Sequence, residues 1–207
     1  MQRIGLILLS VLAVVAGITL SRWMAAPAST LAMATAYPQP RPLPAFALVD
    51  DEGAPFTREH IEGRWRLLFF GFTHCPDVCP LTLSTLSQAV APTSAQDAPA
   101  AQIVLVSVDP ERDTPERMAA YVARFGEDVV GVTGSAQAIA DFAAAAAIAY
   151  GKVPLGDDGE YTVDHSAAVL VVDPEGRIAA VFNPPPPLVA DTIRQDLAVL
   201  KRLADQG

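Results

Sequence analysis

The stretch Gly71-Phe-Thr-His-Cys-Pro-Asp-Val-Cys-Pro80 contains both cysteines of the chain, Cys75 and Cys79. The run before it, Leu67-Leu-Phe-Phe-Gly-Phe72, is short, apolar and without helical period, which predicts a buried central strand. After the cysteines, apolar residues recur at a helical spacing as far as Val90. The cysteines therefore lie where a buried strand turns into a helix. In open α/β sheets this junction carries the chemistry, and the free amides of the helix start favour a thiolate.

The rest of the chain alternates strands and helices around this unit. Strands are expected at residues 46–50, 54–56, 67–72, 102–108, 129–132, 167–172 and 177–182. Helices are expected at residues 57–62, 81–90, 115–125, 135–149 and 188–203, with Thr114 and Ser135 capping the third and fourth. Residues 150–164 contain several glycines and a proline and predict a loop or an irregular hairpin. This order predicts an α/β thioredoxin-like domain in its larger, peroxiredoxin-like variant, with additional N-terminal strands and an inserted middle unit.

The N-terminal part differs in composition from the rest. Residues 4–20 are seventeen uncharged residues preceded by Arg3, a pattern that predicts a secretion signal. We expect a retained membrane anchor rather than a cleaved signal, with the remainder on the periplasmic side of a bacterial inner membrane. The predicted organisation is an anchor or signal segment at 1–22, an Ala/Pro-rich linker at 23–44 and a folded domain at 45–207.

The charge of the chain limits its partners. Beyond Arg22, 12 Lys and Arg stand against 23 Asp and Glu, a net charge of −11. Such a balance opposes binding to the phosphates of nucleic acid, so we expect no nucleic-acid partner. It suits a soluble extracytoplasmic domain, or one that meets cationic partners or metal ions.

Two cysteines four residues apart on a helical turn have β-carbons about 5–6 Å from each other. Three interpretations remain open at this point. A structural disulfide is one, although closing so small a loop stabilises a fold by only about 2 kcal/mol in the chain-entropy model, against roughly 4 kcal/mol or more for a long loop. A redox-active dithiol is the second, with one thiolate favoured by the helix terminus. The third is a metal site that takes one further ligand from elsewhere.

The further ligand could be one of three histidines, His60, His74 and His165. The side chain of His74 is expected to point away from the cysteines, and His60 is expected at the surface. His165 precedes the strand 167–172, and in a thioredoxin-like sheet the loop before that strand approaches the cysteine helix. Two thiolates and one imidazole suit Cu(I), and Cu(II) can also be held, whereas zinc prefers a fourth ligand.

Two carboxylates lie beside the candidate ligands in the sequence. Asp77 stands between the cysteines and Asp164 precedes His165. Either could orient a metal ligand through a hydrogen bond, and either could equally be an ordinary loop or helix-start residue.

Three segments together resemble the Sco/SenC family of copper chaperones of cytochrome c oxidase assembly. They are the cysteine stretch 71–80, Ser107-Val-Asp-Pro-Glu-Arg-Asp-Thr-Pro115, and Val163-Asp-His-Ser166. The resemblance covers residues 44–203 and implies a membrane-anchored thioredoxin-fold protein that binds one copper ion through Cys75, Cys79 and His165. It further implies delivery of copper to the dinuclear copper site of oxidase subunit II. Other copper chaperones or thiol reductants would then be additional partners.

Two rivals to a copper chaperone stay open. A membrane-tethered thiol–disulfide oxidoreductase would use Cys75 and Cys79 as its redox pair to reduce the copper-site cysteines of the partner, and would not require His165. A peroxidase is the other. Peroxiredoxin-type sites resemble Thr-x-x-Cys, whereas Thr73 lies only two residues before Cys75.

Overall fold

A buried parallel pair of strands lies at the centre of the sheet. The computed structural model describes residues 30–94, 100–157, 159–183 and 187–206, and residues 31–207 form one compact unit. Strand β4 (Arg66–Gly71) is buried at every position and pairs in parallel with β5 (Gln102–Ser107). Its other neighbour is β9 (Val169–Val172), which runs antiparallel and is also buried throughout. Continuous apolar runs suit such strands because both faces of the sheet are covered.

The sheet has eight strands and is of mixed direction. Its remaining members are β1 (Ala34–Pro42), β2 (Ala47–Asp50), β3 (Pro55–Thr57), β6 (Val129–Thr133) and β10 (Arg177–Phe182). The spatial order is β1-β10-β9-β4-β5-β6-β2-β3. Three neighbouring strands, β4, β5 and β6, are parallel, and their carboxyl ends therefore meet at one edge. This arrangement confirms the predicted thioredoxin-like α/β fold.

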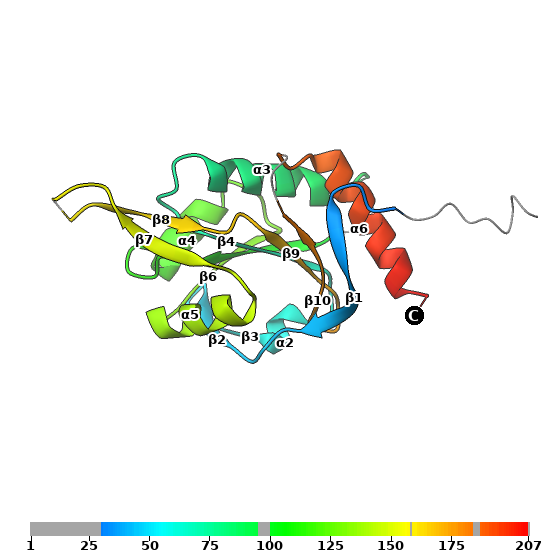
Figure 1. Ribbon diagram of the computed structural model, residues 1–207, viewed down its shortest axis with the longest axis horizontal. Coiled ribbons are helices and arrows are strands. Elements are labelled where there is room, and N and C mark those ends of the chain that lie inside the picture. Colours follow the sequence, from blue (N-terminus) through cyan, green and yellow to red (C-terminus); the bar gives the residue numbers. More distant parts are fainter. Residues whose placement is uncertain (1–29, 95–99, 158, 184–186, 207) are drawn as a thin grey trace, which may run out of the picture. The chain divides into compact units, whose positions relative to one another are not determined.

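The helices are α2 (Arg58–Ile61), α3 (Val78–Val90), α4 (Pro115–Val122), α5 (Ala136–Ala145) and α6 (Ala190–Ala204). Figure 1 shows α3 and α6 along one side of the sheet and α2 and α5 along the other. Two helix starts have the caps that the sequence predicts. The Thr114 side chain accepts a hydrogen bond from the Arg117 amide, and Ser135 accepts one from the Ala138 amide. The predicted hairpin 167–182 is present as β9 and β10.

Strand β1 corrects part of the linker prediction. Residues 34–42 pair antiparallel with β10, with Ala34 opposite Phe182 and Pro42 opposite Arg177. The linker predicted for residues 23–44 is therefore wrong for this strand, and the folded domain begins before residue 45. The prolines in this segment misled the prediction, because proline is tolerated in an edge strand.

The start of β1 is held by a carboxylate from the last helix. Asp196 in α6 is 1% exposed and accepts hydrogen bonds from three consecutive backbone amides, those of Ala32, Met33 and Ala34, at 2.7–2.8 Å. These amides precede or begin the strand, so Asp196 satisfies donors that sheet pairing leaves free.

The segment 150–165 forms a separate two-stranded hairpin. Strands β7 (Tyr150–Pro154) and β8 (Tyr161–His165) pair with each other, with Tyr150 opposite His165, and with no other strand in the described part of the chain. Figure 1 shows this hairpin (yellow) projecting beyond the main sheet. The loop or irregular hairpin expected for residues 150–164 is instead a regular hairpin.

The predicted membrane segment, residues 4–20, lies outside the described residues. Within the part of the chain that the structure describes, no helix has the length and apolarity needed to cross a membrane.

Candidate metal centre

The two cysteines lie between the end of β4 and the first turn of α3. After Gly71 the chain makes a tight turn, in which the Cys75 amide donates a hydrogen bond to the Phe72 carbonyl at 3.3 Å. Helix α3 begins at Val78, which makes Cys79 its second residue. Cys79 is buried and Cys75 is half-buried, and both are free thiols. Cys75 is therefore the less enclosed of the two residues.

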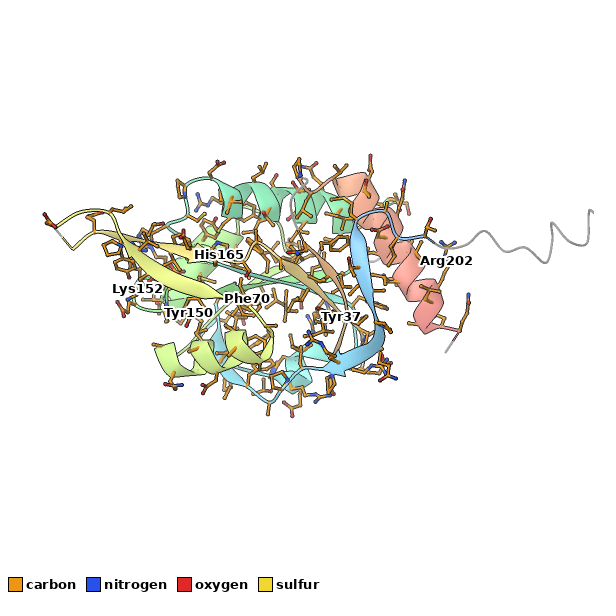
Figure 2. The ribbon with its side chains drawn as sticks, in the orientation of Figure 1. Tyr37, Phe70, Tyr150, Lys152, His165 and Arg202 are labelled. Atoms are coloured by element: carbon orange, nitrogen blue, oxygen red, sulfur yellow. The ribbon has the colours of Figure 1, made fainter. Side chains whose placement is uncertain are left out.

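His165 comes to the cysteines from the hairpin. It is the last residue of β8, and its Nε2 lies 3.4 Å from Cys79 Sγ. The ring packs edge-on against Phe69 and Phe72, with centroid separations of 5.9 and 6.0 Å. Figure 2 shows His165 at the end of the hairpin away from its projecting tip. The expected approach of this histidine to the cysteine helix is confirmed.

The hydrogen bond of the other ring nitrogen identifies the tautomer of His165. Nδ1 lies 3.1 Å from the carbonyl oxygen of Ser166, which can only accept a hydrogen bond. Nδ1 therefore carries the proton, and in the neutral ring Nε2 keeps a free lone pair directed at Cys79 Sγ. Metal-binding histidines are oriented in the same manner, by a partner on the nitrogen that does not bind the metal.

The three side chains form one potential ligand set. Cys75 Sγ, Cys79 Sγ and a ring nitrogen of His165 all lie within 4.8 Å of one another. A shallow hollow opens onto Cys75 and His165, and Phe72 and Pro76 are among its other lining residues. Two soft sulfurs and one imidazole suit a low-coordinate soft ion such as Cu(I). The site fits copper better than a hard, oxygen-preferring cation.

The two thiols are electrostatically unequal. Hydrogen bonds from the Cys79 thiol and from the backbone amides of Cys79 and Asp77 lower the pKa of Cys75 to about 4, although partial burial opposes the shift. The same hydrogen bond with Cys75, together with burial, raises the pKa of Cys79. The Cys79 amide is 3.4 Å from Cys75 Sγ, as expected for a thiolate at a helix start. These shifts favour a thiolate at Cys75 beside a protonated thiol at Cys79.

The other two histidines lie elsewhere, as expected. His60 is exposed in α2, where its Nδ1 accepts a hydrogen bond from the Thr57 amide. His74 is exposed, with its Nδ1 3.9 Å from Asp113 Oδ1. His74, Asp109 and Asp113 also cluster, but both carboxylates are engaged by donors of the protein itself.

The two predicted orienting carboxylates line the hollow beside the ligand set. Asp77 and Asp164 are both exposed. The partner found for His165 Nδ1 is the Ser166 carbonyl rather than Asp164. Asp77 acts on Cys75 through its backbone amide. A role for either carboxylate side chain stays a prediction.

The sequence patterns did not identify the groups that hold the turn before Cys75 in place. Asp113 is fully buried and accepts hydrogen bonds from the amide and hydroxyl of Thr73, at 3.1 and 2.6 Å, and from the Ser107 hydroxyl at 2.7 Å. It thereby ties the turn before Cys75 to the end of β5. One signal for this role was available in the sequence. Asp113 lies in the loop that follows a buried strand, at the edge where the parallel strands end.

A family comparison agrees with this geometry. The family model described as SCO1/SenC matches residues 35–200 of the chain. A protein of Stutzerimonas stutzeri, named as a putative copper-binding protein, is 35% identical over 149 residues, which is 72% of this chain and 72% of that protein. The mitochondrial SCO2 homolog of mouse is 41% identical over 139 residues, 67% of this chain. This chain spans 54% of the length of the mouse protein.

Solved structures show the same fold. The copper-bound ScoI of Arabidopsis thaliana superposes with a TM-score of 0.69 at 32% identity, covering 78% of this chain and 98% of that one. The apo Sco1 protein of Thermus thermophilus gives a TM-score of 0.70 at 37% identity, covering 86% and 99%. With a family model that spans most of the chain and relatives of this similarity, the protein is a member of the SCO1/SenC family.

Proposed function

We propose that this protein is a copper carrier of cytochrome c oxidase assembly. In this proposal one Cu(I) binds between Cys75 Sγ, Cys79 Sγ and His165 Nε2. The ion then passes to the dinuclear copper site of oxidase subunit II. The observation that carries the proposal is the convergence of two sulfurs and one imidazole lone pair within 4.8 Å at the edge of the parallel strands.

The asymmetry of the thiols supports transfer by ligand exchange. Cys75 is half-buried and beside the open hollow, whereas Cys79 is buried. A partner thiolate can approach the metal from the side of Cys75 and displace one ligand at a time. Exchange with a partner disulfide joins the Cys75 thiolate and the Cys79 thiol in a disulfide, and the two electrons and one proton leave with the partner as a thiolate and a thiol. The oxidised pair no longer offers thiolate ligands, so the reduced form binds copper and the oxidised form does not.

The test is copper stoichiometry on the full-length reduced protein in detergent. We expect one copper per chain, with binding lost in Cys75→Ser and Cys79→Ser and sharply weakened in His165→Ala. His60→Ala is the matched control, because His60 is exposed and hydrogen-bonded to Thr57 in a different element. Tight copper binding by the oxidised protein, or binding that ignores His165, contradicts the proposal.

A thiol–disulfide oxidoreductase is the second candidate. Its support is the lowered pKa of Cys75 beside a buried Cys79 thiol, which is the arrangement of an attacking and a resolving cysteine. This function needs both cysteines but not His165. Full reduction of a partner disulfide by His165→Ala, together with weak copper binding by the parent protein, favours this candidate.

The proposed location follows from the sequence. Residues 4–20 would tether the domain to a bacterial inner membrane, with the site on the periplasmic side where oxidase copper sites are assembled. Recovery of the protein in the membrane fraction, and its loss from that fraction when residues 1–29 are removed, is the expected result.

A further inference from the structure

The position of His165 depends on a hairpin outside the main sheet. Among the residues that the structure describes, β7 and β8 pair with each other and with no further strand. A lone two-stranded hairpin is at best marginally stable in water. Four of the five residues of β7 are exposed. Within β8, Val163 is 4% exposed and contacts the core. Further contacts are needed to fix the orientation of the strand end that carries His165.

Those contacts come from the loop after β5. The Tyr161 hydroxyl donates a hydrogen bond to Asp109 Oδ1 at 2.8 Å, and Arg112 Nη1 donates one to the Tyr161 carbonyl at 3.1 Å. The Arg112 guanidinium lies 3.9 Å from the centroid of the Tyr161 ring and is also paired with Asp109. An ion pair of 2.6 Å between Lys152 and Glu111 adds a second connection, which is more exposed. We call Asp109, Arg112 and Tyr161 the hairpin anchor.

The same loop also holds the cysteine turn. Asp109 is fully buried, and its amide donates a hydrogen bond to Ser107 Oγ at 3.0 Å. The Ser107 hydroxyl donates in turn to Asp113, which accepts from Thr73. A continuous set of hydrogen bonds therefore runs from Thr73, two residues before Cys75, to Tyr161, four residues before His165. Because every carboxylate in it is buried, its geometry is tightly constrained.

We propose that the hairpin anchor is a positioning device that holds His165 Nε2 at ligand distance from the two sulfurs. None of its three residues belongs to the ligand set of Cys75, Cys79 and His165. The inference rests on the proposed function, since it assigns these residues a role in placing the third ligand of the copper site. A hairpin without the anchor leaves a dithiol that still binds Cu(I) but engages the imidazole for only part of the time.

The test is Tyr161→Phe in the full-length protein in detergent. This variant removes one hydroxyl and leaves Asp109 with its Arg112 partner. We expect Cu(I) affinity, measured by competition with a chromophoric Cu(I) chelator, to fall about tenfold, the lower end of the range for residues that orient metal ligands. The nitrogen hyperfine signal of the Cu(II) form should weaken in parallel, which a general loss of stability would not produce.

Tyr37→Phe is the matched control. Tyr37 lies on β1, away from His165 in Figure 2, and it too has an arginine over its ring, with Arg41 at 4.6 Å and hydrogen-bonded to its hydroxyl. Loss of the Tyr37 hydroxyl should change neither the Cu(I) affinity nor the nitrogen hyperfine signal. Arg112→Lys is the second variant of the anchor. The lysine keeps the positive charge but cannot reach both Asp109 and the Tyr161 carbonyl. If Tyr161→Phe does not fold, the same two measurements are made on Arg112→Lys.

The outcomes separate the two proposals. If His165→Ala lowers copper affinity while Tyr161→Phe and Arg112→Lys match the parent in affinity and nitrogen signal, the positioning role is wrong and the copper site stands. If His165→Ala has no effect, the proposed copper site itself fails. In the double variant Tyr161→Phe/His165→Ala, the tyrosine change should add nothing, and a further tenfold loss would overturn the inference.

Discussion

The substitution Gly71→Ala adds a single methyl group, which should disturb the packing around Cys79 in the candidate site. Gly71 is the last residue of the buried strand β4. A β-carbon placed there would lie 3.0 Å from Cys79 Sγ, 3.1 Å from Phe69 Cε1 and 3.2 Å from Leu105 Cδ1. All three neighbours are fully buried, so none can move outward into solvent.

The magnitude follows from the balance of two effects. Burying one methyl group stabilises a fold by about 0.8 kcal/mol when space is available. Here it is not available, and overpacked cores lose typically about 1–3 kcal/mol net. For a domain of this size each kcal/mol lowers Tm by about 2–4 °C. The sulfur of Cys79 must also shift by a few tenths of an ångström relative to His165 Nε2, now 3.4 Å away.

The assay compares Gly71→Ala with the parent protein in the reduced, copper-free state. Thermal unfolding should show a lower Tm, and Cu(I) competition should show weaker binding. Gly151→Ala is the matched control, because it lies in β7 near the site and a β-carbon there meets nothing within 4 Å. A Gly71→Ala protein that equals the parent in Tm and affinity would refute the packing argument.

Two further predictions concern the thiols and β1. Because its pKa is lowered to about 4, Cys75 should be a thiolate throughout the neutral range. Iodoacetamide should then alkylate Cys75 at pH 6, and the rate should fall only as the pH drops through about 4. Mass spectrometry should show that Cys79 stays unmodified. An alkylation midpoint near pH 9 would contradict the hydrogen bonds assigned to Cys75. Asp196→Ala should lower the free energy of unfolding by about 2–4 kcal/mol, since it leaves three amides at the start of β1, two part-buried and one buried, without their acceptor. Denaturant unfolding measures this loss, and an unchanged midpoint would show that water replaces the carboxylate.

Local patterns were sufficient for most of the elements and for the placement of the dithiol. The apolar run at β4 and the helical spacing of α3 locate Cys75 and Cys79 at a strand–helix junction, and the structure has them there. The helix starts at Thr114 and Ser135 were also predictable from the sequence, because a cap is a contact between residues three apart. The approach of His165 to the cysteines was predicted from fold topology rather than from any local signal.

Such local patterns could not predict which distant segments pair with each other in the fold. Strand β1 contains three prolines and has no strand periodicity, and it is a strand because β10, more than 130 residues later, offers it a free edge. Tyr161 lies in a segment expected to be a loop or an irregular hairpin. Its role becomes visible only when folding brings it to Asp109, 52 residues earlier in the chain. A hydrogen bond between distant residues leaves no periodicity in the sequence, so the support of the site, unlike its sulfur atoms, was decided by tertiary structure.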